Sequence, residues 1–326
     1  MTTPDHTSAP RLRLGISGCL LGQQVRYNGG HKHSSLCTEV LAPWVDFVSF
    51  CPEQAAGFGT PRPAMHLTGP AHQPQLVQVR DASQNLRPQL EAGFQDALDS
   101  FASLDGFILM ARSPSCGLFR IKLYNSAGEL QREQTRGIFA SALQARYPLL
   151  PVEEEGRLHN PQLFDHFMLR VQAYRHYRNQ VLSAPAPARL TGFHARYKYL
   201  LMAHNPQHTR QMGRYLAQSH SLPLQQRCAD YLQQLMHCLA TPATRKNHSN
   251  ALQHMLGYLR GHVSREARQL LVKSIEQFRH GHQPLHVPLN LLQHYAAQLD
   301  NSYLHQQHYF SPYPVQLHPV NQLKVL

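Results

Sequence analysis

The sequence predicts an α/β domain with an open, mostly parallel sheet, followed by a small all-α helical domain. In the first part of the chain, apolar runs of strand length alternate with stretches whose apolar residues recur every three or four positions. Such alternation is typical of a parallel sheet flanked by helices. In the second part only the helical spacing continues. Between them lies the stiff Ala/Pro segment SAPAPAR at 183–189, so we expect one domain over residues 1–183 and another over 184–326.

The elements of the first domain follow from these patterns. Strands are expected at LRLGIS (12–17), WVDFVSF (44–50) and GFILMA (106–111), because each is a short apolar run. Helices are expected at 86–104 and 135–147, where apolar residues lie three and four positions apart. Open parallel sheets bind their ligands beyond the carboxyl ends of the strands. A functional site is therefore expected among the residues that follow the three strands.

The second domain is expected to be helical throughout. Helical spacing is present at 193–204, 208–218, 224–240, 264–280 and 288–300. Prolines lie between these segments or at their starts, where proline is tolerated. The Pro-rich stretch YFSPYPVQLHP at 309–319 is expected to be extended over the surface.

Positive charge is concentrated in the second domain. The formal net charge of the chain is +12, and residues 184–326 hold 14 Lys and Arg against 4 Asp and Glu, a net of +10. This bias points to a polyanionic partner, and we favour nucleic acid over a basic surface without a ligand. The candidate contacts lie on the first two helices of this domain and are Arg196, Lys198, Arg210 and Arg214. The alternative for each of these residues is an ordinary solvated charge.

The cysteines are expected to be reduced. No apolar run approaches the length needed to cross a bilayer, and the N-terminus lacks the basic and apolar regions of a secretory signal. We therefore expect a cytoplasmic protein, in which disulfides are rare. The six cysteines must then serve metal binding, catalysis or packing, and Cys228 and Cys238 are expected in the helical core.

Three cysteines follow the three expected strands. Cys19, Cys51 and Cys116 come after the runs at 12–17, 44–50 and 106–111. If the strands are parallel, the loops open on one edge of the sheet, where the thiols can converge. Sulfur ligands suit an iron–sulfur cluster or zinc, but this chain lacks the C-x-x-C pairs usual in structural zinc sites. The wide spacing fits a cluster with one iron left without a protein ligand, and buried thiols that pack the loops fit these observations equally well.

Other polar residues stand close to these cysteines. Glu53 lies two positions after one of them and is a candidate general acid or base, or else a carboxylate in the first turn of a helix. Ser113 lies three positions before another and would hydrogen-bond a substrate or stabilise a turn. Arg26 and Arg62, in Gly-bearing loops, are candidate substrate contacts, with solvated charges or structural ion pairs as the alternatives.

The motifs around these residues resemble a known family. SGCLLGQQVRYNGG (17–30), FCPEQAAGFGTPRP (50–63) and SPSCG (113–117), in this order, are similar to the signature segments of the thiouracil desulfidase (TudS) family. PVEEEGRL (151–158) extends the resemblance to nearly all of residues 11–180. The basic helical part, at 193–217 and 288–304, resembles the auxiliary domain fused to it in the tRNA 4-thiouridine desulfidases of the RudS type.

The resemblance implies a [4Fe-4S] cluster held by Cys19, Cys51 and Cys116, with one open iron, and Glu53 and Ser113 in the active site. It implies conversion of 4-thiouridine in tRNA to uridine by non-redox hydrolysis: the open iron binds the thiocarbonyl sulfur, and Glu53 activates a water. One alternative is the same chemistry on free 2- or 4-thiouracil, with the helical domain serving dimerisation. Another is a nucleic-acid-binding regulator with a redox-sensing cluster, which would not need Glu53.

Overall fold

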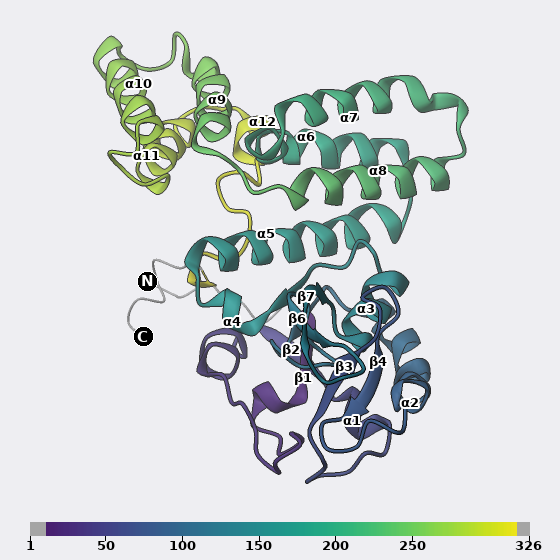
Figure 1. Cartoon of the computed structure of the whole chain (residues 1–326). Coiled ribbons are helices and arrows are strands. Elements are labelled where there is room, and N and C mark those ends of the chain that lie inside the picture. Colours follow the sequence, from purple (N-terminus) through teal and green to yellow (C-terminus); the bar gives the residue numbers. More distant parts are fainter. Residues whose placement is uncertain (1–10, 318–326) are drawn as a thin grey trace. The chain divides into compact units, whose positions relative to one another are not determined.

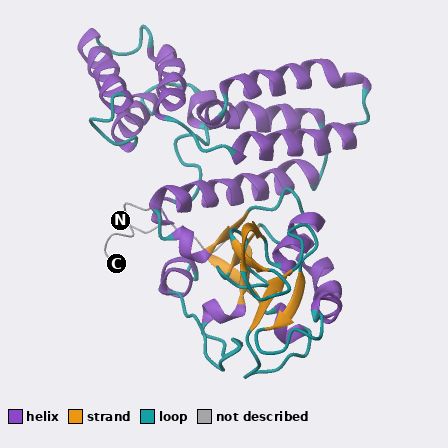
Figure 2. Cartoon of the chain, in the orientation of Figure 1, coloured by secondary structure: helices purple, strands orange, loops and turns teal. Residues whose placement is uncertain are grey.

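The chain folds into two compact units, described here from a computed structural model over residues 11–317 (Figure 1). Residues 11–171 together with Leu317 form the first unit, and residues 172–316 form the second. Strands occur in the first unit, whereas the second consists of helices and loops (Figure 2). The division falls within helix α5 (Pro161–Tyr177), before the Ala/Pro segment at 183–189.

The main sheet of the first unit is parallel throughout. Its strands are β1 (Leu12–Ser17), β2 (Val45–Phe50), β5 (Gly106–Leu109) and β8 (Val152–Glu154), in the order β2-β1-β5-β8. Every neighbouring pair in this sheet runs in the same direction. This confirms the predicted α/β class and parallel sheet, and it places the carboxyl ends of all four strands on one edge.

Helices α2 (Arg87–Ser100) and α3 (Ile138–Arg146) join this sheet through an aromatic core. The ring of Phe139 on α3 lies 5.2 Å from that of Phe50, 5.4 Å from Phe94 and 5.7 Å from Phe107, measured between centroids. These edge-on and tilted contacts tie both helices to strands β2 and β5. The start of α3 is thereby fixed close to the ends of these strands, which matters for the site.

A second sheet, which the sequence did not predict, also belongs to the first unit. It contains β3 (Met65–Thr68), β4 (Gln75–Gln78), β6 (Ile121–Tyr124) and β7 (Leu130–Thr135), in the order β4-β3-β6-β7. Strands β3 and β6 pair in parallel, while the two outer pairs are antiparallel. Three of these strands have only four residues, and β7 (LQREQT) is polar and exposed, so no apolar pattern marks them.

Short helical segments connect these strands and complete the first unit. They are η2 (Gly18–Leu21), η3 (Leu36–Leu41), α1 (Pro52–Ala55), η4 (Phe101–Ser103) and α4 (Glu155–Leu158). Segment η2 begins immediately after β1, and α1 begins after a single residue that follows β2. The chain therefore turns sharply at the edge where the parallel strands end.

The second unit confirms the predicted all-helical region. Its elements are η5 (Arg178–Leu182), α6 (Pro187–His204), α7 (Pro206–Gln218), η6 (Ser219–Ser221), α8 (Leu224–Ala240), α9 (Arg245–Leu256), η7 (Gly257–Leu259), α10 (Arg265–Arg279), α11 (His286–Ala296) and α12 (Ser302–His305). A last short helical turn, η8 (Val315–Leu317), begins in this unit and ends at the residue assigned to the first. Helix α9 was not predicted, because it opens with the polar run RKNHSN. Within residues 11–317, none of the helices is both long and apolar enough to span a membrane.

Buried aromatic residues with satisfied polar ends form the core of the second unit. The rings of Phe193 and Tyr197 stack at 4.2 Å, and Tyr177 packs edge-on against Phe193. The Tyr177 hydroxyl donates to the carbonyl of Cys228 at 2.8 Å, which satisfies a group that would otherwise be buried without a partner. Cys228 and Cys238 are buried, as predicted for core residues.

The prediction for the stretch at 309–319 is wrong for its described part. Tyr309 and Tyr313 are only 3% and 4% exposed, and the Tyr309 hydroxyl lies 2.8 Å from Nδ1 of His248. Just before it, the amide of His308 donates to the carbonyl of Arg196 at 3.0 Å. Prolines gave the stretch a surface-like composition, but its tyrosines bury enough area to fold it back onto the helices. Residues 318 and 319 lie outside the described range.

Partly buried histidines make the stability of the second unit depend on pH. Burial lowers the pKa of His194 to about 4, with Lys198 adding to the effect, and lowers that of His308 to about 4. The unfolded chain therefore binds more protons than the folded one between about pH 6.5 and pH 4, and stability should fall as the pH falls through this window.

We expect the thermal midpoint, followed by tyrosine near-ultraviolet circular dichroism, to drop between pH 7 and pH 5. His194→Asn should reduce this drop, because Asn keeps an acceptor for the Tyr231 hydroxyl, which lies 2.9 Å from His194 Nδ1, and cannot become charged. The exposed His220→Asn is the matched control and should leave the pH dependence unchanged. Equal pH dependence in all three proteins would contradict this explanation.

Candidate active site

A cavity of about 1520 Å³ lies at the carboxyl edge of the parallel sheet. Residues at or after the ends of all four strands line it: Ser17 and Cys19 at β1, Cys51 at β2, Met110 through Pro114 and Cys116 after β5, and Glu154 at β8. The second sheet contributes Met65, Gln134 and Thr135 to the wall. The cavity is thus where the sequence predicted a ligand site, with a wall that the sequence did not predict.

The structure brings together the three cysteines that follow the strands. Cys19 lies in η2, Cys51 precedes α1, and Cys116 lies in the loop after β5. Cys19 and Cys116 are 7% and 6% exposed, Cys51 is half-buried, and all three are free thiols. Cys37, by contrast, is fully buried in η3 and is absent from the cavity wall.

Burial and mutual repulsion disfavour the thiolate forms of these cysteines. Burial, with a contribution from Cys51, raises the pKa of Cys19 to about 11. Burial and the neighbouring Cys51 also raise the pKa of Cys116 well above its usual value, while a hydrogen bond from Ser17 opposes the shift. A positively charged group bound among the three thiols would reverse this preference, because a coordinated thiol loses its proton.

The donor set fits an iron–sulfur cluster. Three soft sulfur donors from three loops face one cavity, and in such a cluster each thiolate binds a different iron. A single ion would need its ligands within bonding distance of one point. In the part of the chain that the structure describes, no three His, Cys, Asp or Glu side chains are arranged to hold a single metal ion.

The Cys116 loop is held by hydrogen bonds to its backbone. The Ser113 hydroxyl oxygen accepts from the amides of Ser115 and Cys116, both at 3.1 Å. At the start of α3, the amide of Gly137 donates to Gly117 at 2.7 Å. Gly137 has to be glycine, because a Cβ there would lie 2.4 Å from the Ser115 carbonyl oxygen. Ser113 therefore stabilises the turn, which was one of the two roles expected for it. It also lines the cavity, where a substrate could reach it.

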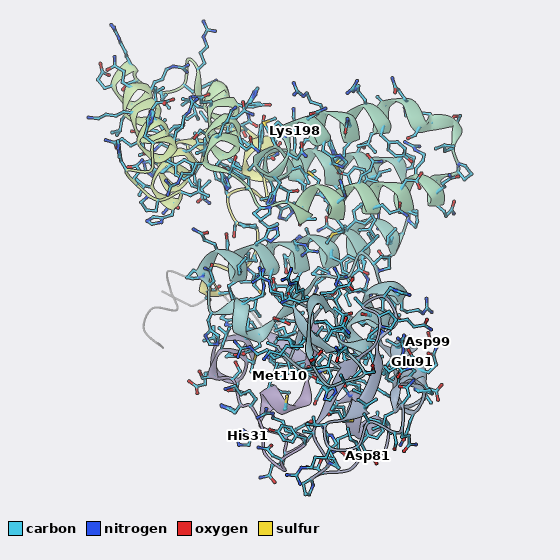
Figure 3. All side chains as sticks on the ribbon, in the orientation of Figure 1. His31, Asp81, Glu91, Asp99, Met110 and Lys198 are labelled. Atoms are coloured by element: carbon cyan, nitrogen blue, oxygen red, sulfur yellow. The ribbon has the colours of Figure 1, made fainter. Side chains whose placement is uncertain are left out.

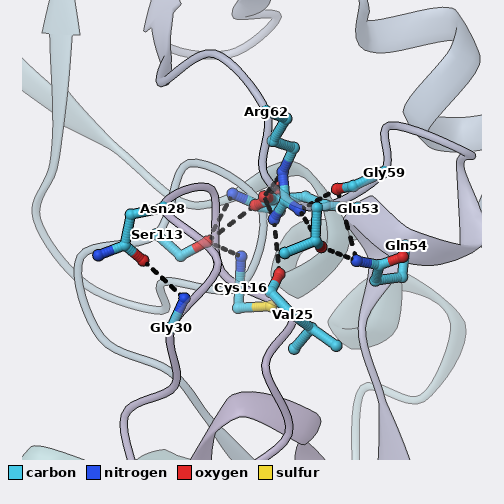
Figure 4. Close-up of polar contacts among 11 residues, drawn as sticks. Val25, Asn28, Gly30, Glu53, Gln54, Gly59, Arg62, Ser113 and Cys116 are labelled. Atoms are coloured by element: carbon cyan, nitrogen blue, oxygen red, sulfur yellow. Dashed lines mark hydrogen bonds and ion pairs between the residues drawn. The ribbon is translucent and has the colours of Figure 1, made fainter.

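Glu53 is the centre of a polar network in the cavity wall (Figure 4). One carboxylate oxygen, Oε2, accepts from Nε of Arg62 at 3.0 Å and also from its Nη2. The other, Oε1, accepts from the Ser115 hydroxyl at 2.8 Å and lies 3.5 Å from that of Ser113. Glu53 also lies in the first turn of α1. It is therefore both a carboxylate in the first turn of a helix and a side chain placed in the cavity wall, where a general acid or base would lie.

Arg62 is engaged within the protein. Its side chain is 4% exposed, it pairs with Glu53, and it donates to the carbonyls of Gly59 at 2.7 Å and Val25 at 2.9 Å. This is the structural ion pair that the sequence left as the alternative to a substrate contact. Arg26 lines the cavity, with its guanidinium carbon 5.7 Å from the centroid of the Tyr27 ring.

Several residues that line the cavity or contact its lining were not found from the sequence. Ser115 is fully buried and contacts Glu53, and Glu154 is 6% exposed. A further group is basic and lies on the cavity wall: Lys32, Arg112, Arg120, Arg136 and Arg157. Arg112 and Arg120 have φ values of 60° and 54°, in the left-handed region that arginine rarely adopts. A single sequence carries no signal for such placements, because they depend on loop geometry.

The four basic residues considered for nucleic acid differ in exposure. Arg210 and Arg214 are exposed and lie four positions apart, on one face of α7. Arg196 and Lys198 on α6 are half-buried. Arg196 donates to Oε1 of Gln180 at 2.7 Å, and the Lys198 ammonium lies 5.7 Å from the Tyr199 ring centroid. The pair on α7 is therefore the better placed for a phosphate backbone.

Two family models match this chain. Residues 14–155 match the model of 2-thiouracil desulfurase, and residues 198–314 match that of a protein of unknown function, DUF1722. The uncharacterized protein YbgA of Escherichia coli strain K12 is 35% identical over 126 residues, which are 38% of this chain and 75% of that protein. The chain therefore belongs to the family of YbgA and joins a 2-thiouracil desulfurase domain to a DUF1722 helical domain. The resemblance found in the motifs is confirmed.

A solved structure is also similar to the first part of this chain. It is described as the [4Fe-4S]-dependent thiouracil desulfidase TudS, with 28% sequence identity and a TM-score of 0.37. The similarity covers 47% of this chain and 97% of that one.

Proposed function

We propose that this protein is a desulfidase that converts 4-thiouridine in tRNA to uridine by non-redox hydrolysis. The observation that carries the proposal is the set of three thiols, two buried and one half-buried, that line one cavity beside the Glu53 carboxylate in a 2-thiouracil desulfurase domain. Cys19, Cys51 and Cys116 would hold a [4Fe-4S] cluster and leave one iron open. That iron supplies a soft Lewis acid for the thiocarbonyl sulfur.

The residues around the cavity supply the proton chemistry. Glu53 takes a proton from the water whose oxygen bonds to the ring carbon, the C–S bond breaks, and the sulfur leaves as hydrosulfide, so no electrons are transferred. Arg62 holds Oε2 of this carboxylate, which leaves Oε1 directed toward the serine hydroxyls. Ser115 and Ser113 orient that oxygen. Arg26 and the other basic residues of the wall favour an anionic substrate such as a nucleotide within RNA.

The helical domain would bind the tRNA. Residues 184–326 carry a net charge of +10, so contacts to phosphates can supply affinity without reading much sequence. A thiolated base within a folded RNA has to leave its stack to enter the cavity, and phosphate contacts on both sides would hold the strand during this step. Catalytic function is assigned to residues 1–183 and RNA binding to 184–326.

The test is to incubate the iron-loaded full-length protein with bulk tRNA without oxygen and to quantify 4-thiouridine and uridine in the digested nucleosides. Loss of 4-thiouridine with a matching gain of uridine is expected. Turnover of free 4-thiouracil but not of tRNA would favour the free-base alternative. No turnover of either, with nucleic-acid binding that changes on reduction of the cluster, would favour a redox-sensing regulator.

Binding to tRNA should depend steeply on salt, since each neutralised phosphate contributes about 0.7–0.9 to the slope of log affinity against log salt concentration. Arg210→Gln combined with Arg214→Gln should weaken tRNA binding and lower this slope by about 1 for each residue. Turnover of free thiouracil should be unaffected. The matched control is Arg80→Gln with Arg132→Gln, two exposed arginines of the first unit. An unchanged slope in the α7 variant would remove α7 from the RNA interface.

The full chain is the right protein for these measurements. Tyr177 precedes the Ala/Pro segment, yet it packs against Phe193 and Tyr231 and donates to the carbonyl of Cys228. A cut within 183–189 would expose this buried tyrosine on the remaining piece. Loss of activity after such a cut could then follow from unfolding rather than from lost RNA contacts.

A further inference from the structure

We infer that Glu154 and Glu155, at the carboxyl end of β8, are positioning residues that fix the loops carrying Cys116 and Cys19. Of the four strands in the parallel sheet, β8 is the one with no cysteine after it. Its end instead carries two consecutive glutamates on the cavity wall. The inference rests on the proposed function only for the identity of the group that the thiols bind.

Glu154 holds the loop of Cys116. The carboxylate is buried, and its Oε1 accepts from the amides of Leu118 at 2.8 Å and Phe119 at 3.1 Å. These amides follow Cys116 by two and three residues. Glu154 itself lies opposite Leu109, the last residue of β5, in the register of the sheet. The carboxylate therefore connects the end of the sheet to the residues that follow Cys116 in its loop. Its negative charge strengthens both hydrogen bonds.

Glu155 holds the loop of Cys19 from the same strand end. Its Oε1 accepts from the Ser34 hydroxyl and lies 2.9 Å from Nε2 of His159. The segment that contains Ser34 is bonded directly to the Cys19 loop. The amide of Lys32 donates to the carbonyl of Cys19, and that of Ser34 donates to Leu20, both at 2.9 Å. Glu155 therefore fixes the Cys19 loop through Ser34.

Together the two glutamates set the separation of two thiols. They are adjacent in the sequence, and their carboxylates bond to segments that follow different strands. Any shift of β8 would move both loops. The position of this one strand therefore determines the distance between the Cys19 and Cys116 thiols. Glu53 links the third cysteine loop to the same frame, since it follows Cys51 and bonds to Ser115.

The test measures how fast each thiol is alkylated in the full-length protein after removal of metal by chelation. Iodoacetamide is used at one fixed pH, and the modified cysteines are resolved by mass spectrometry. Glu154→Ala should speed alkylation of Cys116 by about tenfold or more, because the loss of two buried hydrogen bonds to a charged group favours local opening of the loop. Cys19 should keep its rate. Glu155→Ala should speed alkylation of Cys19 and leave the rate at Cys116 unchanged.

A conservative variant separates hydrogen bonding from general destabilisation. Glu154→Gln keeps a side-chain carbonyl that can accept both amides, so Cys116 should regain its protection. In iron-loaded protein, Glu154→Ala should lower the iron bound per chain and broaden the visible absorption, and Glu154→Gln should restore both. The control is Glu91→Ala on α2, which Figure 3 shows well away from Met110 of the cavity wall.

Two results would overturn the inference. One is equal acceleration of Cys19, Cys51 and Cys116 in Glu154→Ala, which would mean that the whole unit loosens. The other is a Glu154→Gln protein whose Cys116 reacts as fast as in Glu154→Ala. Both results come from alkylation of protein without metal or substrate, so they stand whether or not the protein proves to be a tRNA desulfidase.

Discussion

Replacing Cys19, Cys51 or Cys116 singly with Ala should abolish stable iron binding. The bound iron is expected to fall from about four atoms per chain to a small remnant, because each change removes one of three protein ligands. The structure strengthens this expectation, since all three thiols line one cavity and no other cysteine does. Iron and sulfide analysis after anaerobic reconstitution, together with the visible spectrum, makes the measurement.

Three other cysteines provide matched controls. Cys37, Cys228 and Cys238 are buried, so their change to Ala costs a similar loss of packing without touching the cavity. Each of these variants should keep the brown colour and full iron content. If Cys37→Ala bleaches the protein as completely as Cys116→Ala, the assignment of Cys19, Cys51 and Cys116 as the three cluster ligands is wrong.

Glu53→Gln should lower desulfurase turnover by roughly two orders of magnitude or more, because the amide cannot take the proton of the attacking water. The structure adds a second effect. Arg62 is 4% exposed at its side chain and pairs with Glu53, so the variant leaves a buried charge without its partner. Breaking such a pair costs about 3–5 kcal/mol. The thermal midpoint should therefore fall together with turnover.

A double variant separates the two effects. Glu53→Gln with Arg62→Gln removes both charges, so the midpoint should recover in part while turnover stays low. Iron content, measured in the same preparations, should remain near that of the unchanged protein. Recovery of turnover in the double variant would mean that Glu53 acts only as the partner of Arg62, and general-base chemistry would have to be assigned to another residue.

The sequence was most informative where local pattern and position agree. Apolar runs identified β1, β2 and β5, and the parallel pairing of these strands placed Cys19, Cys51 and Cys116 on one edge. Helical spacing identified α2 and α3, and in the second unit α8 has the predicted bounds. In β1, β5 and these helices the apolar residues that mark the element are those that it buries, whereas in β2 Val45 is buried and the other apolar residues are only partly so.

The rest depended on contacts between distant segments. Ser115 meets Glu53 across 62 positions, and Glu154 meets Leu118 across 36, so no local spacing reveals either contact. The second sheet escaped notice because its strands are short and β7 is polar. The sequence left Arg62 as a substrate contact or a member of an ion pair, and only the fold shows that its guanidinium meets Glu53.

The return of the last described residues onto the helices has a consequence for how the protein is made. The side chain of Gln307 donates to the carbonyl of Ala195, 112 positions earlier, and the Tyr309 hydroxyl contacts the His248 ring. During synthesis, these contacts to α6 and α9 cannot form until residues near 309 have left the ribosome. The first unit has its strands by residue 154 and can fold earlier. We therefore expect the helical unit to be the last part of the nascent chain to become resistant to proteases.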